Sequence, residues 1–247
     1  MIKRETENTI ALVLGSTQYG DSSAIVSLAG DNGLFALMAK GIYKPKSQLK
    51  PLLITGNIVQ VEYAKAIKGP SIASSLRVVM DVSDSLKDYA SSCYLMYLEE
   101  LSLSLFQYGD KFPYEEMKII INALKDKKDV LSLSILTLGV LHHVLGIEIN
   151  TDDCISCHKS KNIVSYDLSE GGFICSDCFS KYDASLKDKM DLFVLKYAFS
   201  SLSEDILSKS VPKSSGIRVL AQLNDNLVTY FDLKPMKSFS LLLNALY

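Results

Sequence analysis

The chain has 247 residues, of which 48% are hydrophobic and 22% charged, with a formal net charge of −2 at pH 7. This composition is typical of a soluble globular protein with one or two compact units. The longest apolar region, Leu131–Ile149, is interrupted by serine, threonine and histidine residues, whereas a membrane span needs about 20 largely apolar residues. The region therefore predicts a buried helix, and a membrane span is excluded.

Charge is distributed unevenly along the chain. Residues 1–80 carry nine Lys/Arg and five Asp/Glu, a net charge of +4, and the remainder carries seventeen and twenty-three, a net charge of −6. This asymmetry favours an N-terminal module that meets a polyanion, although scatter of this size also occurs by chance. The opening residues Met1–Glu7 are not followed by an uninterrupted apolar segment or a small-residue cleavage site, so we expect a cytoplasmic protein.

Residues 1–80 are rich in β-branched and short apolar runs, which are separated by turn-forming Gly, Pro, Asp and Asn. The runs predict five strands, over Thr9–Gly15, Ala24–Leu28, Leu34–Ala39, Ile58–Ile67 and Ile72–Val79. Five short strands at this spacing favour a closed or partly open barrel such as the OB-fold, whose surface accepts oligonucleotides. An SH3-like barrel would show much the same pattern.

After Asp81 the apolar period becomes helical. We expect a helix from an N-cap at Ser83 to about Phe106, a second opened by Pro113, and a third capped by Asp129 and ending near Gly146. Helical pattern returns from Ser185 to Tyr247, with breaks around Ser208–Ser215 and Lys234–Pro235. The expected core includes Tyr94, Tyr97, Phe106 and Tyr108.

Four cysteines interrupt the helical part in the order Cys154-x2-Cys157, seventeen residues, Cys175-x2-Cys178. Two paired-thiolate turns at this separation can close one tetrahedral site, and Gly171 and Gly172 allow the segment between them to double back as a hairpin. We expect one structural Zn²⁺ bound by all four thiolates, because a closed set leaves no position for water or substrate. Its binding free energy would go into folding the segment.

The cysteines admit other interpretations. Cys154–His158 also spells C-x-x-C-H, the attachment motif of c-type haem, but that haem is attached outside the cytoplasm. Disulfides need an oxidising compartment, and a chain of this length has enough core without them. A redox dithiol leaves the second pair unexplained, and a zinc deaminase needs an upstream H-x-E that His142, His143 and His158 do not provide.

These patterns together predict an α+β protein in which a five-stranded OB-fold barrel precedes an α-helical domain with an inserted Cys₄ zinc-finger-like element. The expected boundaries are 1–80 for the barrel, 81–150 for the first part of the helical domain, 151–180 for the insertion and 181–247 for its second part.

The expected nucleic-acid contact is the acid-free stretch 40–50, in which lysines are spaced around one aromatic residue. Its members are Lys40, Tyr43, Lys44, Lys46 and Lys50. Ammonium groups on an exposed loop can neutralise phosphates, and an aromatic ring offers a base a stacking surface. Lys65, Lys68 and Arg77 extend the patch if the barrel brings them to the same face. A lysine-rich loop that is merely solvated is the alternative.

Motifs for catalysis are missing from the sequence. There is no G-x-G-x-x-G, G-x-S-x-G or H-E-x-x-H, and Gly41–Ser47 lacks the second glycine that lets backbone amides cradle a phosphate in a P-loop. A non-enzymatic role is therefore favoured.

Several local motifs resemble the RecO family of bacterial DNA repair and recombination proteins. Leu12–Leu14, Tyr19–Ser23 and Gly33-Leu34 are similar to the family's opening strands, and Ala39–Gly41 with Pro45–Ser47 to its basic signature. Leu141–Gly146 resembles the helix that enters the zinc segment, and Lys234–Ser238 the C-terminal stretch. The resemblance covers nearly the whole chain, with the cysteine set as its most specific part.

The resemblance implies an OB-fold domain, a helical domain and a zinc-finger-like element. It also implies a protein that binds single- and double-stranded DNA, anneals complementary strands, and works with RecR to help RecA replace single-strand-binding protein, whose C-terminal tail the helical domain receives. This chain departs from the basic family pattern, with arginine only at Arg4, Arg77 and Arg218. That departure implies weaker DNA binding, or binding confined to the N-terminal domain. A zinc-stabilised adaptor that binds RNA or protein, and a zinc hydrolase, are the rival interpretations.

Overall fold

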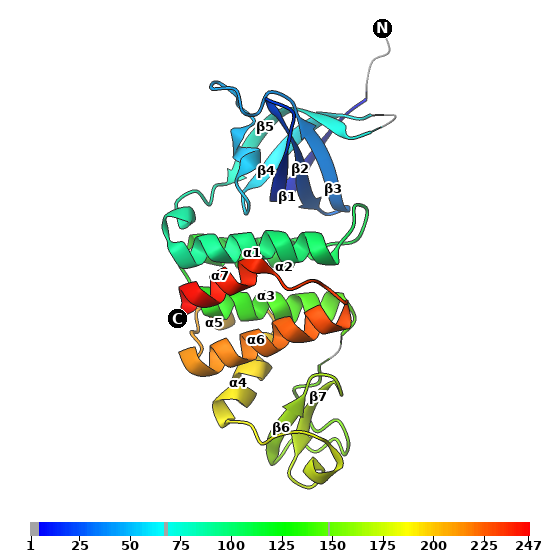
Figure 1. Ribbon diagram of the computed structural model, residues 1–247, viewed down its shortest axis with the longest axis vertical. Coiled ribbons are helices and arrows are strands. Elements are labelled where there is room, and N and C mark those ends of the chain that lie inside the picture. The colour runs from blue at the N-terminus through cyan, green and yellow to red at the C-terminus, as the bar shows by residue number, and fades with distance from the viewer. Residues whose placement is uncertain (1–4, 67–68, 148) are drawn as a thin grey trace. The chain divides into compact units, whose positions relative to one another are not determined.

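The computed structural model describes residues 5–66, 69–147 and 149–247 (Figure 1). The chain forms two compact units. The first comprises Met1–Lys125 together with Met236–Ala245, and the second comprises Asp126–Pro235 together with Leu246–Tyr247. The chain therefore leaves the first unit and later returns to it. Whether residues 1–80 form a domain of their own stays a prediction.

The first unit begins with a closed five-stranded barrel in the order β1-β2-β3-β5-β4, which confirms the expected OB-like architecture (Figure 1). Its strands are β1 (Thr6–Tyr19), β2 (Ser23–Gly30), β3 (Gly33–Ala39), β4 (Ile58–Ala64) and β5 (Ser71–Met80). The first half of β1 pairs with β4 and the second half with β2, so one long strand closes the barrel. The predicted end of the fourth strand, Ile67, lies outside the described residues.

Strand β1 continues beyond Gly15, where the sequence predicted its end. A Cβ atom at Gly15 would lie 2.2 Å from the carboxylate of Glu99, so glycine here permits close approach of a side chain and does not end the strand. Glu99 also accepts a 2.9 Å hydrogen bond from Thr55. Burial raises the pKa of this carboxyl.

Alternate strand residues fill the barrel, among them Val26, Leu28, Val59 and Val61. The loop after β3 adds to this core through Ile42, Leu49 and Leu52, all of which are buried. This loop is therefore anchored at intervals and does not project freely.

Three helices complete the first unit: α1 (Tyr89–Leu105), α2 (Tyr114–Lys125) and α7 (Lys237–Leu246). Helix α1 is capped by Asp88, not by Ser83 as predicted, because the Asp88 carboxylate accepts from Ser91 N–H at 2.8 Å. Ser83 instead donates to Asp81 and precedes a short 3₁₀ turn. The C-terminal helix is fixed to α1 by Glu100, which accepts a 3.0 Å hydrogen bond from Ser238 N–H.

The second unit contains α3 (Val130–Val144), α4 (Lys189–Ala198), α5 (Glu204–Leu207) and α6 (Lys213–Tyr230), with a two-stranded hairpin of β6 (Ile163–Asp167) and β7 (Gly172–Cys175). Helix α3 packs on α4 and α6. Backbones approach closely at Gly139, where a Cβ atom would lie 1.7 Å from the Ala198 carbonyl oxygen. Throughout the described ranges, every helix is too short or too polar to cross a membrane.

The expected cap of α3 is confirmed, since the Asp129 carboxylate accepts from Ser132 N–H at 2.9 Å. Asp129→Ala is expected to lower the free energy of unfolding by about 1 kcal/mol, because a helix N–H loses its partner. Urea denaturation followed by circular dichroism measures the change. Glu116→Ala is the matched control, because it removes an exposed first-turn carboxylate from α2. Equal loss in the two variants would contradict a capping role.

Candidate metal centre and nucleic-acid interface

The β6–β7 hairpin brings the four cysteines together. Cys175 ends β7 and Cys178 follows in the next turn, while Cys154 and Cys157 lie in the loop that precedes β6. Each C-x-x-C segment closes as a turn: His158 N–H donates to the Cys154 carbonyl at 2.8 Å, and Cys178 N–H to the Cys175 carbonyl at 3.1 Å. The turns place both sulfurs of a pair on one side.

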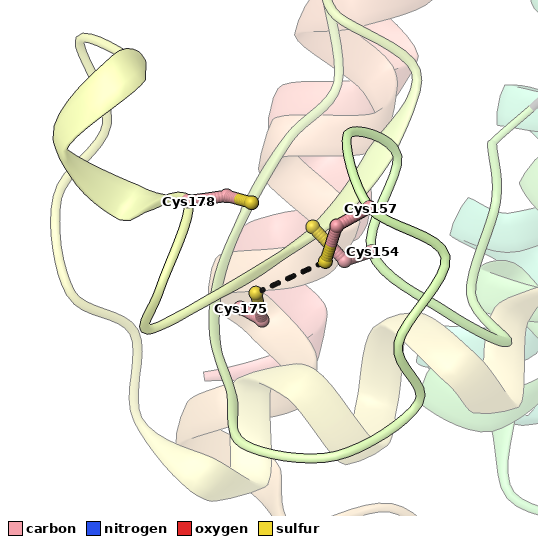
Figure 2. A group of neighbouring side chains, drawn as sticks. All are labelled: Cys154, Cys157, Cys175 and Cys178. Carbon is pink, nitrogen blue, oxygen red and sulfur yellow. Dashed lines mark hydrogen bonds between the residues drawn. The ribbon is translucent and has the colours of Figure 1, made fainter.

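The four sulfurs converge on one point (Figure 2). All four Sγ atoms lie within 4.8 Å of one another, and Cys157 Sγ is 3.6 Å from Cys175 Sγ. For Zn–S bonds of about 2.3 Å, a regular tetrahedron has S–S edges of about 3.8 Å. The thiolate set therefore fits a closed tetrahedral zinc site with little movement.

Hydrogen bonding and burial oppose one another at these sulfurs. Burial alone would raise the pKa of Cys154, but hydrogen bonds from three backbone groups lower it to about 6. Those groups belong to Cys175, Ser156 and Cys157. For Cys157 the backbone of Lys159 also favours the thiolate, yet burial and hydrogen bonds with the neighbouring thiols raise the pKa to about 12. One thiol of the set therefore loses its proton readily, but deprotonation of a second thiol beside it is unfavourable. A bound divalent cation would remove this penalty by neutralising the negative charge of the thiolates.

The surroundings of the centre are small and mostly apolar. Cys154, Cys175 and Cys178 are buried with Ile174, and partly buried side chains such as Phe179 pack around them. The His158 side chain is 75% exposed and lies 3.4 Å from Asp153, so it stands outside the sulfur set. The predicted ligands are thus brought together without a histidine.

The predicted DNA contacts of residues 40–50 lie in one surface loop. Lys40, Tyr43, Lys44, Lys46 and Lys50 are all exposed. The loop is held by its buried apolar residues and by Tyr43 N–H, which donates to the Ser22 carbonyl at 3.1 Å. An anchored loop presents its charges with less loss of conformational freedom on binding.

The residues predicted to extend the patch have partners of their own. Lys65 donates to Glu7 at 2.8 Å, and Arg77 donates to Gln60 at 3.0 Å across the β4–β5 pairing. Lys68 lies outside the described residues. A DNA-binding role for these three residues stays a prediction.

Sequence reasoning missed a cavity in the barrel mouth, between β1, β3 and the facing ends of β4 and β5, which is lined in part by Phe35 and Tyr63. No sequence pattern predicts this cavity, because it depends on how far β3 lies from its neighbouring strands.

Two family models match the chain. Recombination protein O N terminal matches residues 2–77, and recombination protein O C terminal matches residues 86–228. The chain is 25% identical over 173 residues to a DNA repair protein RecO from Halalkalibacterium halodurans, covering 69% of this chain and 68% of that protein. It is 25% identical to RecO proteins from Bacillus cytotoxicus, over 66% and 67% of the two chains, and Bacillus mycoides, over 67% of each.

Among solved structures, an aspartyl tRNA synthetase from Entamoeba histolytica is 13% identical over 57% of this chain and 33% of that one, with a TM-score of 0.24, which is too low to indicate a shared fold. The family models cover most of the barrel, the cysteine hairpin and the helices from α1 into α6, and they leave α7 outside the match. The chain therefore belongs to the recombination protein O family of DNA repair proteins.

Proposed function

We propose that this protein is a recombination mediator that binds single- and double-stranded DNA and anneals complementary strands. With RecR it would help RecA replace single-strand-binding protein, whose C-terminal tail the helices would receive. One structural Zn²⁺ would order Asp153–Phe179, and the protein would act in the cytoplasm at the nucleoid. Family membership supports this role. The observation that carries it for this chain is the exposed, acid-free lysine loop on the barrel.

Annealing follows from charge neutralisation in this proposal. Lysine ammonium groups that displace counterions reduce the repulsion between two phosphate backbones, so complementary bases can meet long enough to pair. No bond is made or broken, so the proposed role is not enzymatic. The loop contacts the backbone and leaves sequence to base pairing.

The double variant Lys44→Glu, Lys46→Glu is expected to weaken binding to single-stranded DNA by roughly tenfold or more and to flatten its salt dependence. Four lysine–phosphate contacts give a log–log salt slope of about −3, and loss of two leaves about −1.4. Fluorescence anisotropy at several salt concentrations measures both quantities. Unchanged binding would show that the DNA contacts lie outside this loop.

The matched control is Lys189→Glu with Lys234→Glu, two exposed lysines of the second unit, which makes the same change in net charge. An equal loss in this control would indicate a general charge effect instead of a loop contact. A strand-annealing assay on DNA coated with single-strand-binding protein then tests the mediator role. Preference for RNA over DNA in competition would favour the adaptor alternative.

A further inference from the structure

The barrel has a cavity of about 570 Å³ at its mouth, between the first half of β1, β3 and the facing ends of β4 and β5. This volume lies within the range of about 300–1,000 Å³ that is usual for small-molecule sites, and barrel mouths are a common place for them. Its lining includes Glu7, Thr9, Asn32, Phe35, Tyr63 and Lys65.

The mouth is open because β3 and β5 share few paired residues where the barrel closes. Over the described residues, β3 pairs with β5 only at Leu37–Ser71 and Met38–Ile72, while the first half of β1 is paired with β4. Phe35 and Tyr63 pack against the apolar core, and their rings lie 6.1 Å apart, tilted by 33°. The two rings thus form an aromatic floor between the core and the solvent.

A hydrogen-bonded chain fixes one of the rings. Tyr63 donates its hydroxyl proton to Glu7 at 2.6 Å, and the other oxygen of Glu7 accepts from Lys65 at 2.8 Å. Desolvation and the contact with Glu7 raise the pKa of Tyr63 to about 12, so the phenol stays a hydrogen-bond donor to Glu7 even at alkaline pH. The ring is therefore neutral and held in place before any ligand arrives.

We propose that this mouth is a subsite for one unpaired nucleobase of a DNA single strand, a proposal that rests on the proposed DNA-binding function. The ring centroids are 6.1 Å apart, which leaves no room for a base between them, so the base would stack on a ring face that is turned toward the cavity. The amide of Asn32 and the hydroxyl of Thr9 offer donors and acceptors for base edges, and the Lys65 ammonium beside them is already paired with Glu7. Bases in a duplex are stacked and paired, so only a single strand can use the site.

The experiment compares a fluorescein-labelled thymidine oligonucleotide with an abasic strand of equal length. Phe35→Leu and Tyr63→Leu keep apolar volume but remove an aromatic face, whereas Tyr63→Phe keeps the ring. The wild-type protein should bind the intact strand roughly tenfold more tightly, in line with base–aromatic stacking. The two leucine variants should remove that preference without weakening abasic-strand binding, and Tyr63→Phe should keep most of it.

Two further measurements distinguish the mouth from the lysine loop as the source of the preference for intact strands. Tyr43→Leu removes the aromatic ring of the lysine loop, and the preference should survive it. A single 2-aminopurine in an otherwise abasic strand should be quenched when the wild-type protein binds, which requires no variant to fold. A preference that persists in folded Phe35→Leu and Tyr63→Leu proteins, or an unquenched probe, overturns the mouth subsite alone. Failure of the wild-type protein to bind either strand overturns the DNA-binding function as well.

Discussion

Chelation of the metal, or replacement of one ligand by Cys175→Ala, is expected to unfold the hairpin while the barrel stays folded. Besides its cysteines and Ile174, the segment buries only a small further core, chiefly Tyr166 and Phe173. Zinc binding contributes roughly 10–16 kcal/mol to the folding of small zinc modules, which is as large as the stability of a whole domain. Zinc would therefore be the largest single contribution to the stability of Ile163–Cys175.

Hydrogen exchange measured by mass spectrometry checks this expectation. Amides of β6 and β7 should lose their protection, whereas those of β1 and β4 should keep it. Cys93→Ala is the control, because this thiol is buried in α1 away from the other four and its loss should leave the zinc content unchanged. Purified protein with less than half an equivalent of zinc, or a hairpin that stays protected after chelation, would count against a structural metal.

Gly139→Ala is expected to destabilise the second unit by about 3 kcal/mol, despite alanine's better helix propensity. The new methyl group would meet the backbone of Ala198, and a backbone cannot rotate away as a side chain can. Helices α3 and α4 would have to separate, which opens voids along their contact. Urea denaturation of the purified variant measures the loss.

Gly216→Ala provides the comparison, because it adds the same methyl group to a helix. Its nearest neighbours, 2.7 and 2.8 Å away, are side-chain methyl groups of Leu131 and Val211 that can shift. We expect a change below about 1 kcal/mol, since the gain in helix propensity offsets mild crowding. Equal losses in the two variants would refute the distinction between backbone and side-chain neighbours.

The parts of the fold that follow from local chemistry were predictable from the sequence. Apolar and β-branched runs between turn residues predicted the five strands, Asp129 marked the start of α3, and the spacing of the cysteines predicted that the four sulfurs come together. Each of these signals lies within a few residues of the feature it specifies.

Features that depend on distant contacts were missed. Gly15 looked like the end of a strand, because its partner Glu99 is remote in sequence. Tyr108 was expected in the core as an aromatic residue, but it is 57% exposed and its hydroxyl contacts Ser27 of the distant strand β2. The ion pair of Lys65 with Glu7 likewise joins the two strands at one end of the β1–β4 pairing, and residue spacing alone does not fix that register.

The return of α7 to the first unit has a consequence during synthesis on the ribosome. The docking surface that α1 offers through Glu100 stays vacant until the last residues of the chain emerge. At typical translation rates, the roughly 110 intervening residues of the second unit take on the order of 5–20 s to be made. The nascent first unit therefore lacks helix α7 during the whole time in which the second unit is translated.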